Sequence, residues 1–185
     1  CGTGGMLSVA KEHLVDKAET EEGIARTEDR VMLFGQEILP QNYAICQADM
    51  LIKGEVDSNI TLGNSLIPDI ESVLDDGDQH ANTEFDYMLS NPPFGVNWSE
   101  YKKDAKKYDT SRYKVGTPSV SDGALLFLLT MIEKMKAPDE GGSKIALLFN
   151  GSPLSHGDAT QGDSELRRYI LEKDLLDTSV MQPDE

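Results

Sequence analysis

The sequence contains few cysteines and lacks any long apolar run. Its 185 residues include two cysteines, which excludes a framework of disulfides and leaves the fold to depend on a hydrophobic core. No apolar run approaches the ~18 residues of a membrane span, and no signal-peptide pattern is visible. We therefore expect a cytoplasmic protein that does not act at a membrane.

Positive charge is also scarce. Lysine and arginine number 17 against 33 acidic residues, which gives a net charge of −16. Proteins hold nucleic acid largely by neutralising its phosphates with Lys and Arg, so this composition argues against binding DNA or RNA through a basic face of the chain itself. Any role on DNA would need a partner. The three histidines, His13, His80 and His156, lack metal-ligand spacing, and we predict no metal site.

Hydrophobic residues make up 38% of the chain, which is enough for a core. Strand-like segments alternate with helix-like ones, which predicts an α/β fold with a mainly parallel sheet, in a single domain over residues 1–185. Residues 98–118 are polar and indicate a long mobile loop, whose Lys- and Tyr-rich part (101–113) either lies near DNA or is simply solvated. Helices are expected over 6–18, 43–52, 123–136 and 164–173, the last capped by Ser164. Buried strands are expected over 31–34 and 144–149, and further strands over 60–64, 85–89 and 175–181, of which 60–64 has the weaker pattern.

Unusual polar residues follow several of these expected strands. They are Glu37, Asn64, Asn91 and Asn150. In parallel sheets, ligands bind at the carboxyl ends of the strands, where the loops converge. The sequence therefore predicts that one edge of the sheet gathers all four side chains into a site.

The glycine cluster Gly2-Thr3-Gly4-Gly5 precedes the first expected helix. Glycine accepts positive φ and has no Cβ, so such a loop allows a ligand to approach the backbone closely, although a plain turn has the same pattern. The lysine and hydroxyl of a phosphate-binding loop are missing, which favours an uncharged or zwitterionic nucleoside over ATP. Glu37 stands where an acidic residue accepts hydrogen bonds from ribose hydroxyls, or else is a solvated carboxylate at a strand end.

The most specific pattern is Asn91-Pro92-Pro93-Phe94, at the end of the strand expected over 85–89. Each proline fixes φ and lacks an N–H, so the tetrapeptide forms a stiff extended corner with carbonyl groups free to accept. Asn91 and Pro92 offer two acceptors beside the flat ring of Phe94. This combination suits a planar amine, and we take all four residues as candidate catalytic residues.

With these residues a family resemblance becomes visible. The sequence resembles the modification subunit of type I restriction-modification systems, which are S-adenosylmethionine-dependent DNA adenine N6-methyltransferases. Within it, NPPF is typical of amine methylation, and FGQE and the DGALLF helix are typical of the type I group. The segments that carry the resemblance are CGTGGML, FGQE, NYAICQADMLIKG, LSNPPFG and DGALLFLLTMIEKMK.

The resemblance implies a Rossmann-like methyltransferase core, with helices on both faces of the sheet and S-adenosylmethionine as cofactor. Asn91 and Pro92 would accept hydrogen bonds from the target amine, and Phe94 would stack on an adenine flipped out of duplex DNA. The implied cofactor contacts are Gly2, Thr3, Gly4 and Gly5 at the methionine end, Glu37 at the ribose hydroxyls, and Ile38 and Asn64 at the adenine. At the position of Asn64, members of the family often have Asp.

The implied partners are a DNA specificity subunit, with or without an endonuclease subunit. Because the chain begins at Cys1, we expect a fragment whose first strand lies before that residue, and which by itself binds cofactor poorly and does not methylate DNA. Three alternatives stay open at this stage: methylation of a protein glutamine, methylation of an RNA base amine, and a non-catalytic assembly subunit that keeps the same fold.

Overall fold

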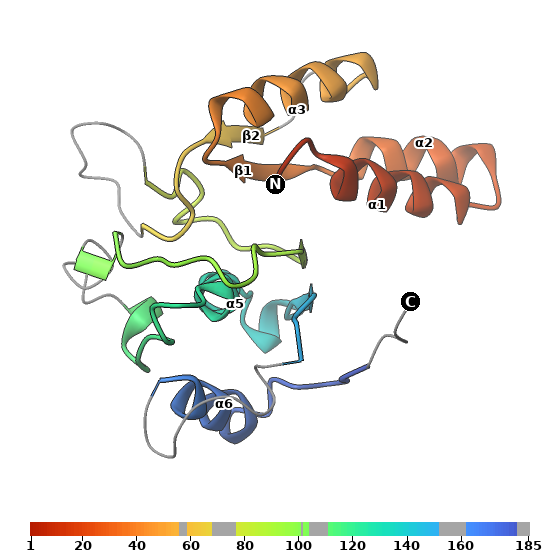
Figure 1. Ribbon diagram of the computed structural model, residues 1–185. Helices are drawn as coiled ribbons and strands as arrows, with labels where there is room; N and C mark the ends of the chain where they lie inside the picture. Colours follow the sequence, from red (N-terminus) through yellow and green to blue (C-terminus); the bar gives the residue numbers. More distant parts are fainter. Residues whose placement is uncertain (56–58, 68–76, 101, 104–110, 152–161, 181–185) are drawn as a thin grey trace. The chain divides into compact units, whose positions relative to one another are not determined.

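A computed structural model describes residues 1–55, 59–67, 77–100, 102–103, 111–151 and 162–180. The chain divides into two compact units, Cys1–Thr83 and Glu84–Glu185, called here the first and second unit. Each unit contains one pair of parallel strands with helices around it (Figure 1). Parallel pairing joined by helical segments is the α/β arrangement that the sequence predicts. The single domain over residues 1–185 stays a prediction.

The first unit consists of three helices and one parallel strand pair within its described residues. Its strands run in register from Phe34 opposite Asn59 to Glu37 opposite Leu62. Glu37 therefore lies at the carboxyl end of the pair. The elements are α1 (Gly5–Asp16), α2 (Glu21–Arg30), β1 (Phe34–Glu37), α3 (Pro40–Ile52) and β2 (Asn59–Leu62).

A small apolar core joins α3 to one face of this strand pair. Leu33, Cys46, Met50 and Ile60 are its buried members, and Leu7, Val31 and Tyr43 pack against them. Gly4 precedes α1 with φ of 86°, and a Cβ added there would lie 2.7 Å from both the Cys46 and Met50 side chains. The backbone before α1 can reach this core only because residue 4 has no side chain.

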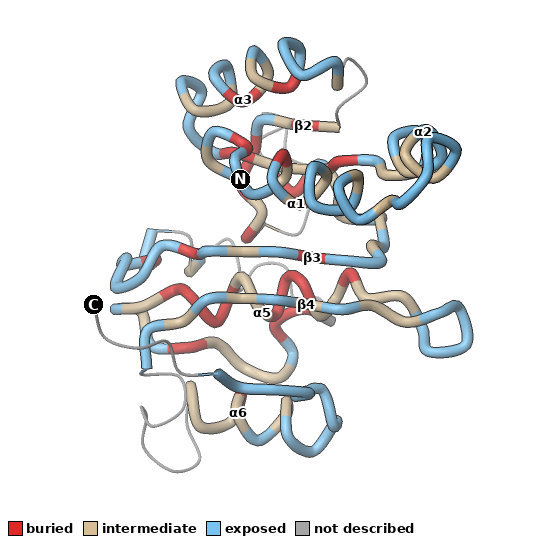
Figure 2. The backbone as a smooth tube through the Cα atoms, turned by 90° about the vertical axis from the view of Figure 1, so that its right-hand side faces the viewer, coloured by how far each residue is buried: buried red, intermediate tan, exposed pale blue. Residues whose placement is uncertain are grey.

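The second unit carries the other strand pair and a largely apolar helix. Tyr87 pairs with Lys144 and Ser90 with Leu147 in parallel register. The helix α5 contributes six buried residues to the interior, as the red segments of Figure 2 show. The elements are β3 (Tyr87–Ser90), η1 (Ser111–Tyr113), α5 (Ala124–Glu133), η2 (Pro138–Glu140), β4 (Lys144–Leu147) and α6 (Asp163–Glu172).

The four predicted helices are confirmed as α1, α3, α5 and α6, but α2 was not predicted. No residue of α2 is buried, so it shows no apolar stripe of the kind from which helices are recognised. Its signal is a cap, because the Thr20 hydroxyl accepts the Gly23 N–H at 3.0 Å. Conversely, the predicted Ser164 cap is wrong: α6 begins at Asp163 and its N-cap is Gly162.

The predicted strand over 175–181 is also wrong for its described residues. Residues 175–180 are exposed and form no strand, and residue 181 lies outside the described part. Instead, the Leu175 N–H donates to Ile170 O at 3.0 Å and closes the last turn of α6. Strand β1 begins at Phe34 rather than at residue 31, and β4 is only half-buried, because Lys144 and Ala146 are exposed on one face.

The described ends of the predicted mobile loop are packed. Trp98 is 2% exposed and Arg112 is 3% exposed, and the Arg112 guanidinium pairs with Glu133 of α5. The prediction of a mobile loop is therefore wrong at Trp98 and at Arg112. Residues 101 and 104–110 lie outside the described residues.

Candidate active site

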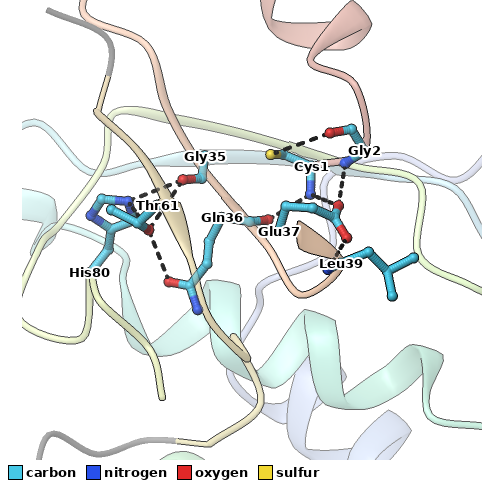
Figure 3. Close-up of polar contacts among 8 residues, drawn as sticks. All are labelled: Cys1, Gly2, Gly35, Gln36, Glu37, Leu39, Thr61 and His80. Carbon is cyan, nitrogen blue, oxygen red and sulfur yellow. Dashed lines mark hydrogen bonds and ion pairs between the residues drawn. The ribbon is translucent and has the colours of Figure 1, made fainter. Parts of the chain in front are cut away.

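Glu37 lies buried at the carboxyl end of β1, and its carboxylate holds the glycine loop in place. Its Oε1 accepts the Leu39 N–H at 2.9 Å and its Oε2 accepts the Gly2 N–H at 2.7 Å (Figure 3). The Cys1 nitrogen lies 3.3 Å from Oε2. Burial alone would raise the pKa of Glu37, but the hydrogen bonds from the Leu39 and Gly2 N–H groups lower it and help to hold the pKa below its ordinary value of 4.5. The carboxylate is therefore ionised at neutral pH.

An ionised carboxylate has acceptor capacity beyond these two backbone bonds. Its two oxygens offer about four acceptor positions: the Leu39 N–H uses one on Oε1, and the Gly2 N–H and the Cys1 nitrogen use those on Oε2. The remaining position, on Oε1, suits a hydroxyl donor such as that of a ribose. The chemistry of Glu37 thus fits the sugar of a nucleoside ligand.

The four residues of the glycine loop have different surroundings. Around Gly2, with φ of 60°, and around Gly5, an added Cβ would meet no atom within 4 Å, and Thr3 is exposed. Gly4 instead is buried against α3. The structure therefore brings Gly2 to Glu37 and leaves open space beside Gly2 and Gly5. Gly4 has a packing role that the sequence reasoning missed.

Asn64 lies at the same end of the first strand pair. The preceding Gly63 donates its N–H to Glu37 O at 2.9 Å, and the Asn64 Oδ1 accepts the Leu66 N–H at 3.0 Å. Asn64 is 7% exposed, yet its Nδ2 makes no hydrogen bond to any residue in the described part of the chain. A buried amide NH₂ group without an acceptor is a sign of a ligand position. The Asn64 NH₂ group could donate to a ring nitrogen of a ligand.

Ile38 follows Glu37 and is 46% exposed. Its apolar side chain, the Glu37 carboxylate and the Asn64 amide together offer a nucleoside an apolar contact, an acceptor for hydroxyls and a donor. The residues of the first unit thus fit an adenosine-type cofactor.

Gln36 is a second residue that the sequence reasoning missed. On the opposite face of β1 from Glu37, its Nε2 donates to Gly77 O at 3.1 Å and its Oε1 accepts the Gln79 N–H at 2.9 Å. In Figure 3, His80 lies on this side too, with its Nε2 3.3 Å from both Thr61 Oγ1 and Gly35 O. The FGQE motif could have indicated a role for Gln36, because this residue directly precedes Glu37 in it. Gln36 fixes residues 77–79 beside β1.

The corner Asn91-Pro92-Pro93-Phe94 begins directly after β3 in the second unit. The preceding residue, Ser90, accepts the Leu148 N–H at 3.1 Å, so the strand pair is still held at the point where the corner starts. Pro92 is buried, whereas Asn91, Pro93 and Phe94 are exposed, Phe94 by 41%. Within the described residues the Asn91 side chain makes no hydrogen bond. The second strand pair therefore ends in a stiff corner that presents an amide and an aromatic ring.

Each unit gathers two of the four predicted polar residues at the carboxyl end of its strand pair. Glu37 ends β1 and Asn64 follows β2 in the first unit, while Asn91 and Asn150 follow β3 and β4 in the second. The single edge that would combine all four remains a prediction. No group of three or more potential metal ligands occurs among the described residues. No described helix has both the length and the apolarity to cross a membrane.

Comparison with known proteins adds the family. The whole chain, residues 1–185, matches the family described as N-6 DNA Methylase. It is 28% identical over 181 residues to the type I restriction enzyme MjaIX methylase subunit of Methanocaldococcus jannaschii, covering 95% of this chain and 28% of that protein. It is 23% identical over 189 residues to the MpnII methylase subunit of Mycoplasma pneumoniae, covering 99% of this chain and 31% of that protein.

Solved structures show the same relationship. A modification subunit from Vibrio vulnificus YJ016, described as part of a type I restriction enzyme, superposes with a TM-score of 0.67 at 27% identity, over 92% of this chain and 32% of that one. The type I restriction-modification methyltransferase subunit of Streptococcus thermophilus gives a TM-score of 0.64 at 24% identity, with the same coverage. The chain spans about a third of the length of these relatives.

The predicted resemblance to type I modification subunits is thereby confirmed, as is the methyltransferase fold. With a family match over its full length, the chain belongs to the N-6 DNA methylase family.

Proposed function

We propose that this chain is the catalytic part of a type I modification subunit, which transfers a methyl group from S-adenosylmethionine to the N6 amine of adenine in DNA. The observation that carries the proposal is the Asn91-Pro92-Pro93-Phe94 corner at the end of β3, with Asn91 and Phe94 exposed, in a chain of the N-6 DNA methylase family. The relatives named as methylase subunits support the type I assignment.

The corner suits an exocyclic amine because such a nitrogen is a poor nucleophile. Its lone pair is delocalised into the adenine ring. The Asn91 Oδ1 and the Pro92 carbonyl would accept its two N–H groups, localise the lone pair on nitrogen and stabilise the positive charge that develops there. Phe94 would stack on the base once it has left the duplex. One proton then leaves the nitrogen to water, so no placed base is required.

S-adenosylmethionine would supply an electrophilic methyl group on a positively charged sulfur. In the first unit, Glu37 would accept the ribose hydroxyls, Ile38 would pack on the adenine ring and the Asn64 amide would donate to a ring nitrogen. The methionine end would lie along the loop formed by Gly2, Thr3, Gly4 and Gly5, where Gly2 and Gly5 border open space.

The proposed partners come from the resemblance to type I modification subunits and agree with the charge of the chain. A net charge of −16 gives it little attraction for phosphates, so a DNA specificity subunit would supply contact with the duplex, with or without an endonuclease subunit. We propose that this complex acts on DNA in the cytoplasm.

The test uses the modification subunit assembled with its specificity subunit. Radiolabelled methyl transfer from S-adenosylmethionine is measured to duplex DNA, to the same duplex with N6-methyladenine in place of adenine, to RNA and to protein. Transfer to the unmodified duplex, lost when the adenines are already methylated, is expected. Transfer to RNA or to protein instead, or no transfer to any of the four, would contradict the proposal.

A further inference from the structure

Trp98, four positions after Phe94, is tied to the segment that leads into α5. It is 2% exposed, its indole N–H donates to Ser119 O at 2.8 Å, and its backbone N–H donates to Val120 O at 3.1 Å. A buried tryptophan whose N–H is paired is held in position and orientation at once. The chain after the corner is therefore fixed at residue 98.

Gly123 completes this attachment from the other side. Its N–H donates to Val96 O at 3.2 Å, and a Cβ at this position would lie 3.3 Å from Trp98 Cδ1 and 3.5 Å from Trp98 Cβ. The indole thus rests against a residue that has no side chain. Immediately beyond, the Asp122 Oδ1 accepts the Ala124 N–H at 3.0 Å where α5 begins. Residues 96–98 are joined to residues 119–123 by backbone, side-chain and packing contacts together.

Both flanks of the corner are consequently anchored. Upstream, β3 is paired to β4 as far as Ser90. Downstream, Val96 and Trp98 are held by Gly123, Val120 and Ser119, after a left-handed turn at Gly95 with φ of 63°. The segment 91–95 therefore connects Ser90, which is paired with β4, to Val96, which is bonded to Gly123. Asn91 and Phe94, which lie in this segment, are exposed.

We propose that Trp98, seated on Gly123, is a positioning residue for methyl transfer: it holds the Asn91–Phe94 corner in the geometry that the target amine requires. The inference rests on the proposed function, because it assigns Trp98 a part in that reaction. Reaction rates depend strongly on the positions of the reacting groups, and a displacement of about 1 Å lowers the rate on the order of 100-fold. Exposed side chains on a short segment keep a fixed orientation only if the residues that flank the segment are held rigidly. Trp98 touches neither substrate nor cofactor in this proposal and acts through the corner.

Three substitutions in the complete complex test the proposal. We expect Trp98→Ala to lower kcat by roughly 30- to 100-fold, because both the packing and the N–H bond to Ser119 are lost. Trp98→Phe, which keeps a ring against Gly123, should recover most of this loss. Gly123→Ala forces the indole to shift by a few tenths of an ångström, and a loss of about threefold to tenfold is expected. The KM for S-adenosylmethionine should stay within about twofold in all three, because the proposed cofactor contacts lie in the first unit.

The matched control is Leu129→Ala. Leu129 is a buried residue of the same helix, 4% exposed, and its side chain forms none of the hydrogen bonds that hold residues 96–98. It should lower the melting temperature while leaving kcat, at a temperature where the complex is folded, within about twofold. Losses of kcat that merely follow the loss of melting temperature across the four variants would overturn the proposal, and so would a rise in cofactor KM without a fall in kcat.

Hydrogen exchange separates this inference from the proposed function. In the assembled complex, the amides of residues 98 and 123, which donate to Val120 O and Val96 O, should exchange at least about tenfold faster in Trp98→Ala than in Leu129→Ala. Unchanged exchange would overturn the inference even if the wild-type complex methylates DNA. A wild-type complex that transfers no methyl group would contradict the proposed function, whereas faster exchange in Trp98→Ala would still show that Trp98 holds the corner.

Discussion

The two strand pairs are both parallel, but the candidate site residues at their carboxyl ends differ in burial. At the end of β1 and β2, the Glu37 carboxylate and the Asn64 amide are buried and already bonded to backbone N–H groups. At the end of β3, Asn91 and Phe94 are exposed. The polar groups of the first end therefore suit the buried part of a ligand, whereas Asn91 and Phe94 at the second end are accessible from solvent.

The difference shows how rigidity is supplied in each case. The first end is held by its own polar groups, since Glu37 binds the Gly2 and Leu39 backbone. The second end is held through its flanks, by β3 pairing on one side and by Trp98 on the other, and Pro92 between them is buried. Substitutions at the first end should therefore change stability and cofactor binding together, while those of the exposed residues at the second should change methyl transfer or DNA binding with little change in stability.

Asn91→Ala provides the largest expected effect and the strongest challenge to this contrast. Removing one acceptor from the transition state should lower kcat by about 100- to 1,000-fold, or roughly 2.7–4 kcal/mol. Because the Asn91 side chain has no hydrogen-bond partner among the described residues, the free energy of unfolding and the KM for S-adenosylmethionine should change little. Single-turnover kinetics and urea denaturation measure the two effects. Asn82→Ala, at another exposed Asn, is the control that should leave both unchanged.

Gly4→Ala tests the packed side of the first end. The added Cβ would lie 2.7 Å from the Cys46 and Met50 side chains, at a φ of 86° that a residue with a Cβ adopts at a cost. The expected loss is about 2–4 kcal/mol in the free energy of unfolding. Gly5→Ala, where an added Cβ meets no atom within 4 Å, should cost far less. Equal losses in denaturant titrations would show that the packing at Gly4 is not the cause.

Glu37→Gln sharpens the electrostatic side of the comparison. Loss of charge-assisted hydrogen bonds should weaken both cofactor binding and folding by about 1.5–3 kcal/mol. Because the pKa of Glu37 is lower in the folded state than its ordinary value of 4.5, its ionised form stabilises the fold above about pH 4.5 and this stabilisation is lost as the pH falls through the folded pKa. The stability difference between wild type and variant should therefore shrink below that pH, and a constant difference down to about pH 3 would contradict this.

Phe94→Leu gives the smallest expected effect. Leucine keeps an apolar surface but has no ring face, and stacking on an unpaired base contributes about 1–3 kcal/mol. We expect a loss near the lower end, seen as a fivefold to tenfold rise in the KM for DNA, with no change in stability because Phe94 is already 41% exposed. Phe94→Tyr, which retains the ring, should behave like wild type, and a comparable rise in that variant would exclude stacking as the cause.

Local patterns predicted the elements that carry their own signals. The apolar stripe of α5 and the prolines that end β3 act within a few residues, so both were readable. Helix α2 was missed because none of its residues is buried. The strand expected after α6 does not form over residues 175–180, because an apolar run becomes a strand only when a neighbouring strand pairs with it.

The sequence by itself determined the stiffness of the Asn91–Phe94 corner, the place of Glu37 at a strand end and the family to which the chain belongs, because proline geometry and short motifs depend on adjacent residues alone. Tertiary structure decided that Gly2 donates to Glu37, that Gly4 packs on Cys46 and that Trp98 rests on Gly123. These contacts join residues that are far apart along the chain. They exist because packing and loop closure bring those residues together, and no local pattern records such partners.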